Sequence, residues 1–224
     1  MSRKHIVFDL DGTLVDSALH CAALLSEMLE ERGSLRRITR TDAVPHMSYG
    51  GPYLVTTLLG DECGDSESEV TNFRARYAAR PTPERCIYPG VRQGLATLAG
   101  HGFVLGVCSN KPQALCDKIV DELGLRPSIA SVVGGRADLP AKPHRAMLDL
   151  NLTEMGGTAE TALLVGDSEV DHELAIAAGL PFWLVSYGYP GQDWMPVAEA
   201  WFDGFEQVVA ALCAADDRPE RLIV

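Results

Sequence analysis

Short apolar runs recur along the chain and are bounded by glycine, proline and polar residues. Each run is nearly continuous, which is typical of a strand covered on both faces and not of an amphipathic helix. Their short length also favours strands, because helices in folded domains are usually longer. We therefore predict five buried strands, over residues 4–10, 102–108, 129–133, 161–165 and 182–185.

Segments with helical spacing separate these runs. Within residues 17–31, for example, the four apolar residues Leu24, Leu25, Met28 and Leu29 fall on one face of a helix. Strands that alternate with helices predict an α/β fold whose parallel sheet is covered on both faces, a doubly wound sheet. The other predicted helices cover residues 54–59, 71–79, 112–123, 143–151, 170–178 and 205–214.

The segment 17–85 has helical patterns but no strand-like run. It follows the first predicted strand directly and is divided by a Gly-Gly-Pro break at 50–52 and a charged stretch at 61–69. We therefore predict two domains. A helical cap at 17–85 is inserted into a core that is formed by residues 1–16 and 86–224.

The composition fits a folded chain of this kind and narrows its partners. Apolar residues make up 46% of the 224 residues, and the formal net charge is −12. A surface with this net negative charge repels anions, so nucleic acids and anionic membranes are disfavoured as binding partners. The chain shows no secretory signal or membrane-spanning run, and its six cysteines lack metal-binding spacing, so we predict a cytoplasmic protein with reduced thiols.

Carboxylates follow two of the predicted strands. Asp9 and Asp11 end the first strand, and Asp167 ends the fourth, with Asp171 shortly after it. In a doubly wound sheet the carboxyl ends of the strands meet at the ligand-binding edge, so these side chains should converge there. A cluster of carboxylates in a partly buried site needs a compensating cation, and all-oxygen ligands suit Mg²⁺.

Hydrogen-bond donors and a lysine are expected at the same edge. Ser109 and Asn110 follow the second strand in the sequence, and Thr13 follows the first. Lys142 precedes Pro143, which we predict to be the first residue of a helix. Such donors beside Mg²⁺ suit a phosphoryl group, and an aspartate there can act as a nucleophile.

Four segments resemble the sequential motifs of the haloacid dehalogenase-like hydrolase superfamily. Their order and spacing also match, and the similarity to the phosphoglycolate phosphatase-like branch covers nearly the whole chain. The resemblance implies a Rossmann-like core with a helical cap and a Mg²⁺-dependent hydrolase. The segments are DLDGTLVDS at 9–17, VCSNKP at 107–112, AKPH at 141–144 and VGDSEVD at 165–171.

The resemblance also implies catalytic roles. Asp9 would be the nucleophile that attacks phosphorus, and Asp11 would protonate the leaving oxygen and then activate water. Lys142 would neutralise charge on Asp9 and on the phosphoryl group. The dehalogenases that name the superfamily lack a carboxylate at the position of Asp11, so the resemblance favours hydrolysis of a phosphate ester over dehalogenation.

Binding roles follow from the same resemblance. Mg²⁺ would be held by Asp167, the Asp9 carboxylate and the Asp11 backbone carbonyl. Asp171 would orient the coordination shell of the metal. Ser109 would hydrogen-bond the phosphoryl oxygens and so contribute to catalysis. The residues implied for phosphate binding are Gly12, Ser109, Asn110 and Lys142.

Substrate selection is expected to depend on the cap, since the core motifs bind only phosphate and metal. Residues 46–52 resemble the cap stretch that faces the active site in this branch. Arg74 and Arg76 are candidate contacts for a carboxylate or a second phosphate. Phosphoglycolate is the leading candidate substrate by resemblance alone, and Arg145, where many relatives have proline, is assigned no role.

Alternative functions stay open at this point. A phosphomutase or a pyrophosphatase would use the same chemistry. A receiver-type module that accepts a phosphoryl group also combines clustered aspartates, a hydroxyl residue and lysine, but it needs no long helical insertion. A catalytically silent scaffold is disfavoured because every motif residue is present. The sequence does not define the oligomeric state.

Overall fold

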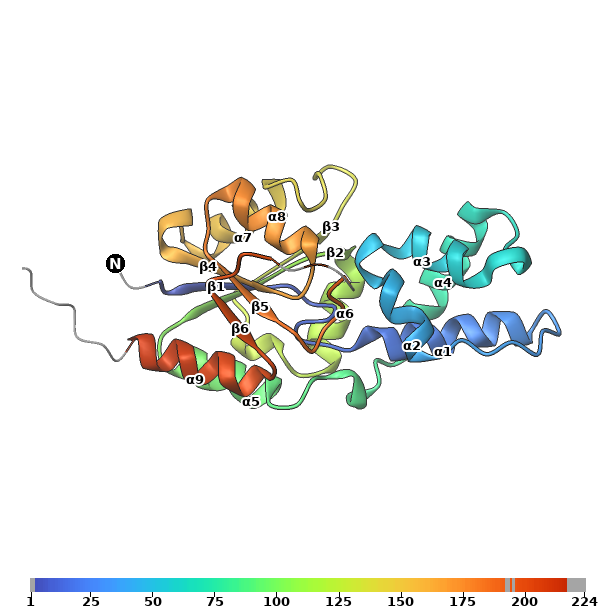
Figure 1. Ribbon diagram of the computed structural model, residues 1–224, viewed down its shortest axis with the longest axis horizontal. Coiled ribbons are helices and arrows are strands. Elements are labelled where there is room, and N and C mark those ends of the chain that lie inside the picture. Colours follow the sequence, from blue (N-terminus) through green and yellow to red (C-terminus); the bar gives the residue numbers. More distant parts are fainter. Residues whose placement is uncertain (1–2, 192–193, 195, 217–224) are drawn as a thin grey trace, which may run out of the picture.

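The computed structural model describes residues 3–191, 194 and 196–216 (Figure 1). Within these residues six parallel strands form one sheet with the order β3-β2-β1-β4-β5-β6. The central strand β1 pairs in register with β2 on one side and β4 on the other. The strands are β1 (His5–Phe8), β2 (Val104–Pro112), β3 (Ser131–Gly135), β4 (Ala162–Gly166), β5 (Phe182–Val185) and β6 (Ala200–Phe202).

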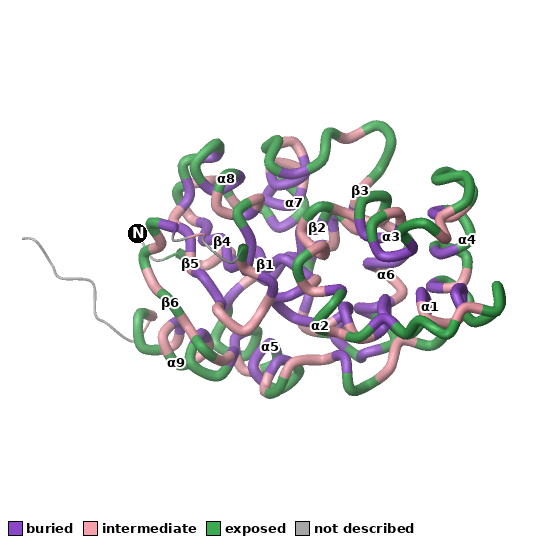
Figure 2. The backbone as a smooth tube through the Cα atoms, turned by 45° about the vertical axis from the view of Figure 1, so that its right-hand side comes forward, coloured by how far each residue is buried: buried purple, intermediate pink, exposed green. Residues whose placement is uncertain are grey.

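Helices cover both faces of the sheet, as predicted for a doubly wound fold (Figure 1). Successive residues of β1 point to opposite faces, so Ile6 and Phe8 join one apolar cluster and Val7 joins another. Figure 2 shows β1 and β4 as buried at the centre of the molecule. One face packs against α5 (Val91–Gly100), α6 (Gln113–Glu122) and α9 (Phe205–Asp216), and the other against α7 (Ala146–Met155) and α8 (Glu169–Ala178).

Residues 17–85 are mostly helical, and the α-helices among them lie at one end of the molecule (Figure 1). These helices pack through apolar residues such as Leu25 and Phe73, which belong to the same buried cluster as one face of the sheet. We propose that this segment is the cap, with boundaries at residues 17 and 85. Its α-helices are α1 (Ser17–Glu30), α2 (Arg40–Ala43), α3 (Gly51–Leu59) and α4 (Ser66–Ala79).

Several element boundaries differ from the prediction for local reasons. Helix α4 begins within the charged stretch, because the Asp65 side chain accepts a hydrogen bond from the Ser68 amide and caps it. Helix α5 and the edge strand β6 were not predicted. Two residues of β6 are partly buried, Trp201 is exposed and the strand is three residues long, so it carries no buried apolar run.

The predicted helix start at Pro143 is wrong. Helix α7 begins at Ala146, and the chain before it forms a turn that contains a cis peptide bond between Lys142 and Pro143. Lys142 is therefore not held at a helix N-terminus. In the part of the chain that the structure describes, no helix has the length and apolar character needed to span a membrane.

Candidate active site

The loop after β1 places two aspartates at the carboxyl edge of the sheet. The Asp9 amide donates to the Val165 carbonyl at 2.9 Å, which extends the pairing of β1 with β4 by one residue. The chain then turns at Gly12, where φ is +88° and a Cβ atom would lie 2.1 Å from Oδ2 of Asp167. Only glycine fits this turn, because a side chain would collide with the carboxylate.

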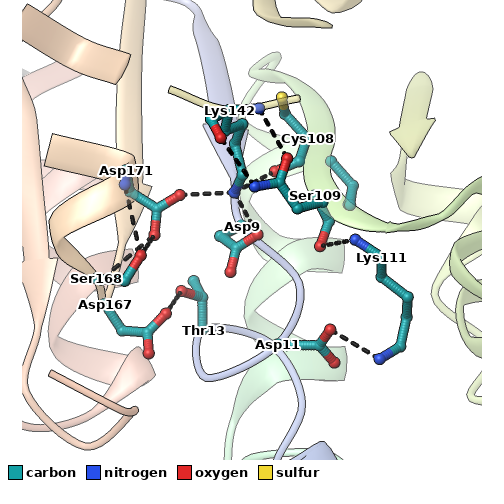
Figure 3. Close-up of polar contacts among 12 residues, drawn as sticks. Asp9, Asp11, Thr13, Cys108, Ser109, Lys111, Lys142, Asp167, Ser168 and Asp171 are labelled. Atoms are coloured by element: carbon teal, nitrogen blue, oxygen red, sulfur yellow. Dashed lines mark hydrogen bonds and ion pairs between the residues drawn. The ribbon is translucent and has the colours of Figure 1, made fainter. Parts of the chain in front are cut away.

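Lys142 lies at the centre of the site (Figure 3). Its Nζ donates to Oδ1 of Asp9 at 2.7 Å, to Oδ1 of Asp171 at 2.6 Å and to the Cys108 carbonyl at 2.9 Å. Its backbone is held by the Asn110 side chain, which accepts from the Lys142 amide at 2.7 Å and donates to its carbonyl at 3.0 Å. This pair of bonds, and not a helix start, positions the lysine.

The loop after β4 fixes the other two carboxylates. Ser168 is the N-cap of α8 and donates its hydroxyl to Oδ2 of Asp171 at 2.7 Å, so Asp171 is held within the first turn of the helix. Asp167 accepts from the Thr13 hydroxyl at 3.2 Å and from the Tyr189 amide at 2.6 Å. Each carboxylate therefore has a fixed orientation.

Three of these carboxylates form a buried acidic cluster. One oxygen from each of Asp9, Asp167 and Asp171 lies within 4.8 Å of the others, and each residue is at most 7% exposed. Burial raises the pKa of Asp9 to about 7 although Lys142 acts to lower it, and burial also raises the pKa of Asp167 well above its usual value. The single ammonium of Lys142 leaves the cluster short of positive charge. A hard dication bound by these oxygens would supply it, so the residues fit Mg²⁺.

A cavity of about 310 Å³ opens over this site. Ser109 is buried at its base, and Asp9, Asp11 and Asn110 line it as well. Gly12 does not line the cavity but lies behind it against Asp167. The cap contributes the other wall, formed by residues 47–52, Leu54, Phe73, Arg74 and Tyr77.

The two predicted cap arginines have different surroundings. Arg74 lines the cavity and makes no hydrogen bond or ion pair within the described residues. Arg76 does not line the cavity. Its guanidinium donates instead to both oxygens of Glu31, at 2.5 and 2.7 Å. The expectation of a substrate contact from Arg76 is therefore not supported. Arg145 pairs with Asp149 outside the cavity.

Lys111 was not assigned a role from the sequence. Its Nζ donates to Oδ2 of Asp11 at 2.8 Å, and its side chain is only 10% exposed. It stands two residues after Ser109, in the segment where polar residues were already expected to converge. Its position at the end of β2 was the available signal, but a lysine after a strand is more commonly solvated.

A parallel α/β sheet with an acidic cluster and a lysine at its carboxyl edge, under a helical insertion, is typical of a capped α/β enzyme that acts on phosphate esters. Comparison with protein families makes this assignment specific. The model of the haloacid dehalogenase-like hydrolase family matches residues 3–179, and the chain belongs to this family.

Individual relatives agree with this assignment. The phosphoglycolate phosphatase of Rhodospirillum rubrum is 35% identical over 215 residues, which cover 90% of this chain and 88% of that protein. The phosphoglycolate phosphatase of Cereibacter sphaeroides is 34% identical over 189 residues, covering 82% and 85%. The chain is thus a phosphoric monoester hydrolase of the haloacid dehalogenase-like family.

Solved structures share the fold. A crystal structure described as a predicted phosphoglycolate phosphatase from Haemophilus somnus superposes with a TM-score of 0.81 at 25% identity, covering 93% of this chain and 97% of that one. CbbY from Rhodobacter sphaeroides, solved in complex with phosphate, gives a TM-score of 0.71 at 21% identity and covers 92% and 96%. The latter similarity concerns the fold alone.

Proposed function

We propose that this enzyme is a Mg²⁺-dependent phosphatase that hydrolyses a small phosphorylated metabolite through an aspartyl-phosphate intermediate. The observation that carries the proposal is the position of Asp9. Its carboxylate lines the cavity, pairs with Lys142 at 2.7 Å and belongs to the buried acidic cluster. A nucleophile, a neutralising cation and a candidate metal site therefore meet at one point.

The proposed reaction has two steps. In the first, an oxygen of Asp9 attacks phosphorus, the bond from phosphorus to the leaving oxygen breaks, and Asp11 gives that oxygen a proton. In the second, Asp11 takes a proton from water, the water oxygen attacks phosphorus, and the bond between phosphorus and Asp9 breaks. The products are an alcohol and inorganic phosphate, and both aspartates return to their initial state.

The metal would be held by Asp9, Asp167 and the Asp11 carbonyl, with Asp171 orienting its shell. When bound, Mg²⁺ supplies positive charge to the phosphoryl oxygens and keeps the carboxylates ionised. Lys142 contributes a second positive charge beside Asp9 and holds this side chain in place through one hydrogen bond.

Phosphate binding is proposed to use donors around the base of the cavity. The Ser109 hydroxyl and Lys142 line it, and the Asn110 side chain is already committed to the Lys142 backbone. Asn110 therefore contributes to phosphate binding chiefly by holding Lys142. Gly12 contributes by allowing the turn after Asp11 to pack closely against Asp167.

Phosphoglycolate is the proposed substrate. A cavity of about 310 Å³ suits a small metabolite. Arg74 provides a guanidinium without an anionic partner on the cap side, across the cavity from the phosphate site. This cation suits the carboxylate of a substrate that carries one anion at each end. The names of the curated relatives support the same substrate.

The proposal is tested by measuring phosphate release from phosphoglycolate and from p-nitrophenyl phosphate, with Mg²⁺ and with EDTA. We expect turnover with Mg²⁺, none with EDTA, and none for Asp9→Asn. Asp121→Asn is the matched control, since Asp121 pairs with Arg126 on the surface. A phosphomutase would instead require a bisphosphate activator and release little phosphate. Unchanged turnover by Asp9→Asn would exclude the assignment of the nucleophile.

A further inference from the structure

Lys111 connects Asp11 to the cap. Its ammonium donates to Oδ2 of Asp11 at 2.8 Å, while Oδ1 of Asp11 makes no hydrogen bond within the described residues. Both side chains line the cavity (Figure 3). One oxygen of the proposed acid and base is thus fixed by Lys111, and the other is buried and has no hydrogen-bond partner among the described residues.

The other side of the ammonium faces an aromatic ring of the cap. The Nζ of Lys111 lies 4.8 Å from the centroid of the Tyr77 ring, which is within the range of a cation–π interaction. Tyr77 belongs to α4 and is only 1% exposed, and it packs edge-on against His20 at 4.6 Å and against Phe73 at 6.2 Å. The ring is therefore itself held firmly.

The charge of Lys111 is stable in this position. Burial by itself lowers the pKa of a lysine, but the Asp11 carboxylate more than offsets this and holds the pKa of Lys111 well above its usual value. The ammonium is thus a permanent partner for Asp11 at neutral pH.

We infer that Lys111 is a positioning residue, which fixes the Asp11 carboxyl group at the wall of the cavity, with the Tyr77 ring of the cap holding the ammonium in place. This inference rests on the proposed role of Asp11 as acid and base. Without Lys111, the Asp11 side chain would lose its hydrogen bond to the ammonium and be free to turn away from the cavity. A proton donor must lie within hydrogen-bond reach of the leaving oxygen, so this displacement slows the first step.

The dependence on the leaving group distinguishes this role from a structural one. An alkoxide leaves poorly without a proton, whereas p-nitrophenolate leaves readily without one. For Lys111→Met we expect kcat/KM to fall by about 100-fold with phosphoglycolate, within the range for loss of acid–base catalysis, and by less than about 5-fold with p-nitrophenyl phosphate. We use kcat/KM because it reports the step in which the leaving group departs.

Ethyl phosphate separates this role from direct binding of a substrate carboxylate. It has a poor leaving group and no carboxylate, so the inference predicts the same loss as with phosphoglycolate. A loss confined to phosphoglycolate would overturn the inference and make Lys111 a substrate contact. An equal loss with all three substrates would also overturn it, because it would indicate a general structural effect.

Other variants complete the test. Lys111→Arg keeps the charge and the contact with the ring, so it should retain kcat/KM within about 10-fold. Lys118→Met, which removes a lysine paired with Glu122 outside the cavity, should leave all three substrates unchanged. Lys111→Gln repeats the measurement if Lys111→Met does not fold.

Asp11→Asn separates the inference from the proposed function. If this variant keeps full kcat/KM with ethyl phosphate, the proposed role of Asp11 fails. If it loses activity selectively with the alkyl phosphates while Lys111→Met and Lys111→Gln do not, the proposed function stands and the inference about Lys111 fails.

Discussion

Lys142 and Asp9, which are 133 residues apart in the sequence, form a buried ion pair with 2.7 Å between Nζ and Oδ1. The lysine side chain is only 4% exposed and donates to two carboxylates and one carbonyl. The same ammonium therefore holds the proposed nucleophile and compensates part of the acidic cluster.

Replacing Lys142 should affect both activity and stability. For Lys142→Met we expect kcat to fall by about 100- to 1,000-fold, the usual effect of losing a group that stabilises charge in the transition state. Loss of one partner of a buried ion pair should also lower the free energy of unfolding by about 3 kcal/mol. Lys142→Arg should not restore activity, because a planar guanidinium cannot donate in the three directions that the ammonium uses.

Phosphate-release assays and urea unfolding check this prediction. Lys118→Met serves as a control for the loss of a lysine at a site outside the cavity. A Lys142→Met variant that retains activity near that of the wild type would contradict the proposed role.

Because Asp167 belongs to the acidic cluster, we expect Asp167→Asn to have opposite effects on thermal stability with and without metal. Asp167→Asn removes one buried negative charge and keeps one oxygen that can accept from the Tyr189 amide, while its NH2 group can donate to the Thr13 hydroxyl. In EDTA the variant should therefore melt at a higher temperature than the wild type, because repulsion in the cluster is relieved.

In Mg²⁺ the order should reverse. The wild type should be stabilised by metal binding, by about 2.7 kcal/mol at 100 times the dissociation constant, whereas Asp167→Asn should show little change. Differential scanning fluorimetry over a Mg²⁺ titration measures both effects. Glu173→Gln, which neutralises an exposed acid on α8, should behave as the wild type. Equal Mg²⁺ stabilisation of Asp167→Asn would argue against a metal at this cluster.

Arg74 should determine the affinity for the carboxylate end of the substrate. For Arg74→Met we expect KM for phosphoglycolate to rise about 10-fold or more, since a charge-assisted hydrogen bond contributes about 1.5–3 kcal/mol. KM for p-nitrophenyl phosphate, which lacks a carboxylate, should not change. Arg76→Met is the matched control on the same helix, because Arg76 pairs with Glu31. A similar rise in KM for both substrates would contradict a carboxylate contact.

His20 should make the stability of the fold depend on pH. Burial lowers its pKa to about 4, and nearby cations such as Lys111 act in the same direction. Because the folded-state pKa lies below the unfolded value of 6.5, the unfolded chain binds the proton more tightly. Stability is therefore lost as the pH falls from about 6.5 to about 4, by on the order of 3 kcal/mol.

His20→Phe isolates this contribution, since phenylalanine keeps an aromatic contact with Tyr77 but does not titrate. Urea unfolding of both proteins near neutral pH and at about pH 4 measures the change. We expect the variant to gain stability relative to the wild type as the pH falls. If the difference between the two proteins stays constant with pH, His20 is not the group responsible.

The central part of the site could be predicted from the sequence because it depends on where buried strands end. The apolar runs of β1, β2 and β4 are local signals, and parallel pairing brings their carboxyl ends together. Asp9, Ser109 and Asp167 were therefore expected at one edge, and the structure places them there around one cavity.

Other features depend on contacts that no local pattern contains. Lys142 is positioned by the Asn110 side chain, 32 residues away, and not by the helix that Pro143 was expected to start. Arg74 and Arg76 are both arginines of the cap, and the sequence does not distinguish them. Arg76 is neutralised because the fold brings it next to Glu31, which lies 45 residues before it in the sequence. The pair of Lys111 with Asp11 spans 100 residues.

Acid-quenched mass spectrometry during turnover shows whether Asp9 carries the phosphoryl group. With Mg²⁺ and excess phosphoglycolate, peptides from the quenched wild type should show one added phosphoryl group on Asp9. Asp9→Asn should show none, and Asp11→Asn should accumulate more of it with p-nitrophenyl phosphate, because activation of water is impaired. Steady turnover with the label absent from Asp9, or located on another residue, would contradict this role of Asp9.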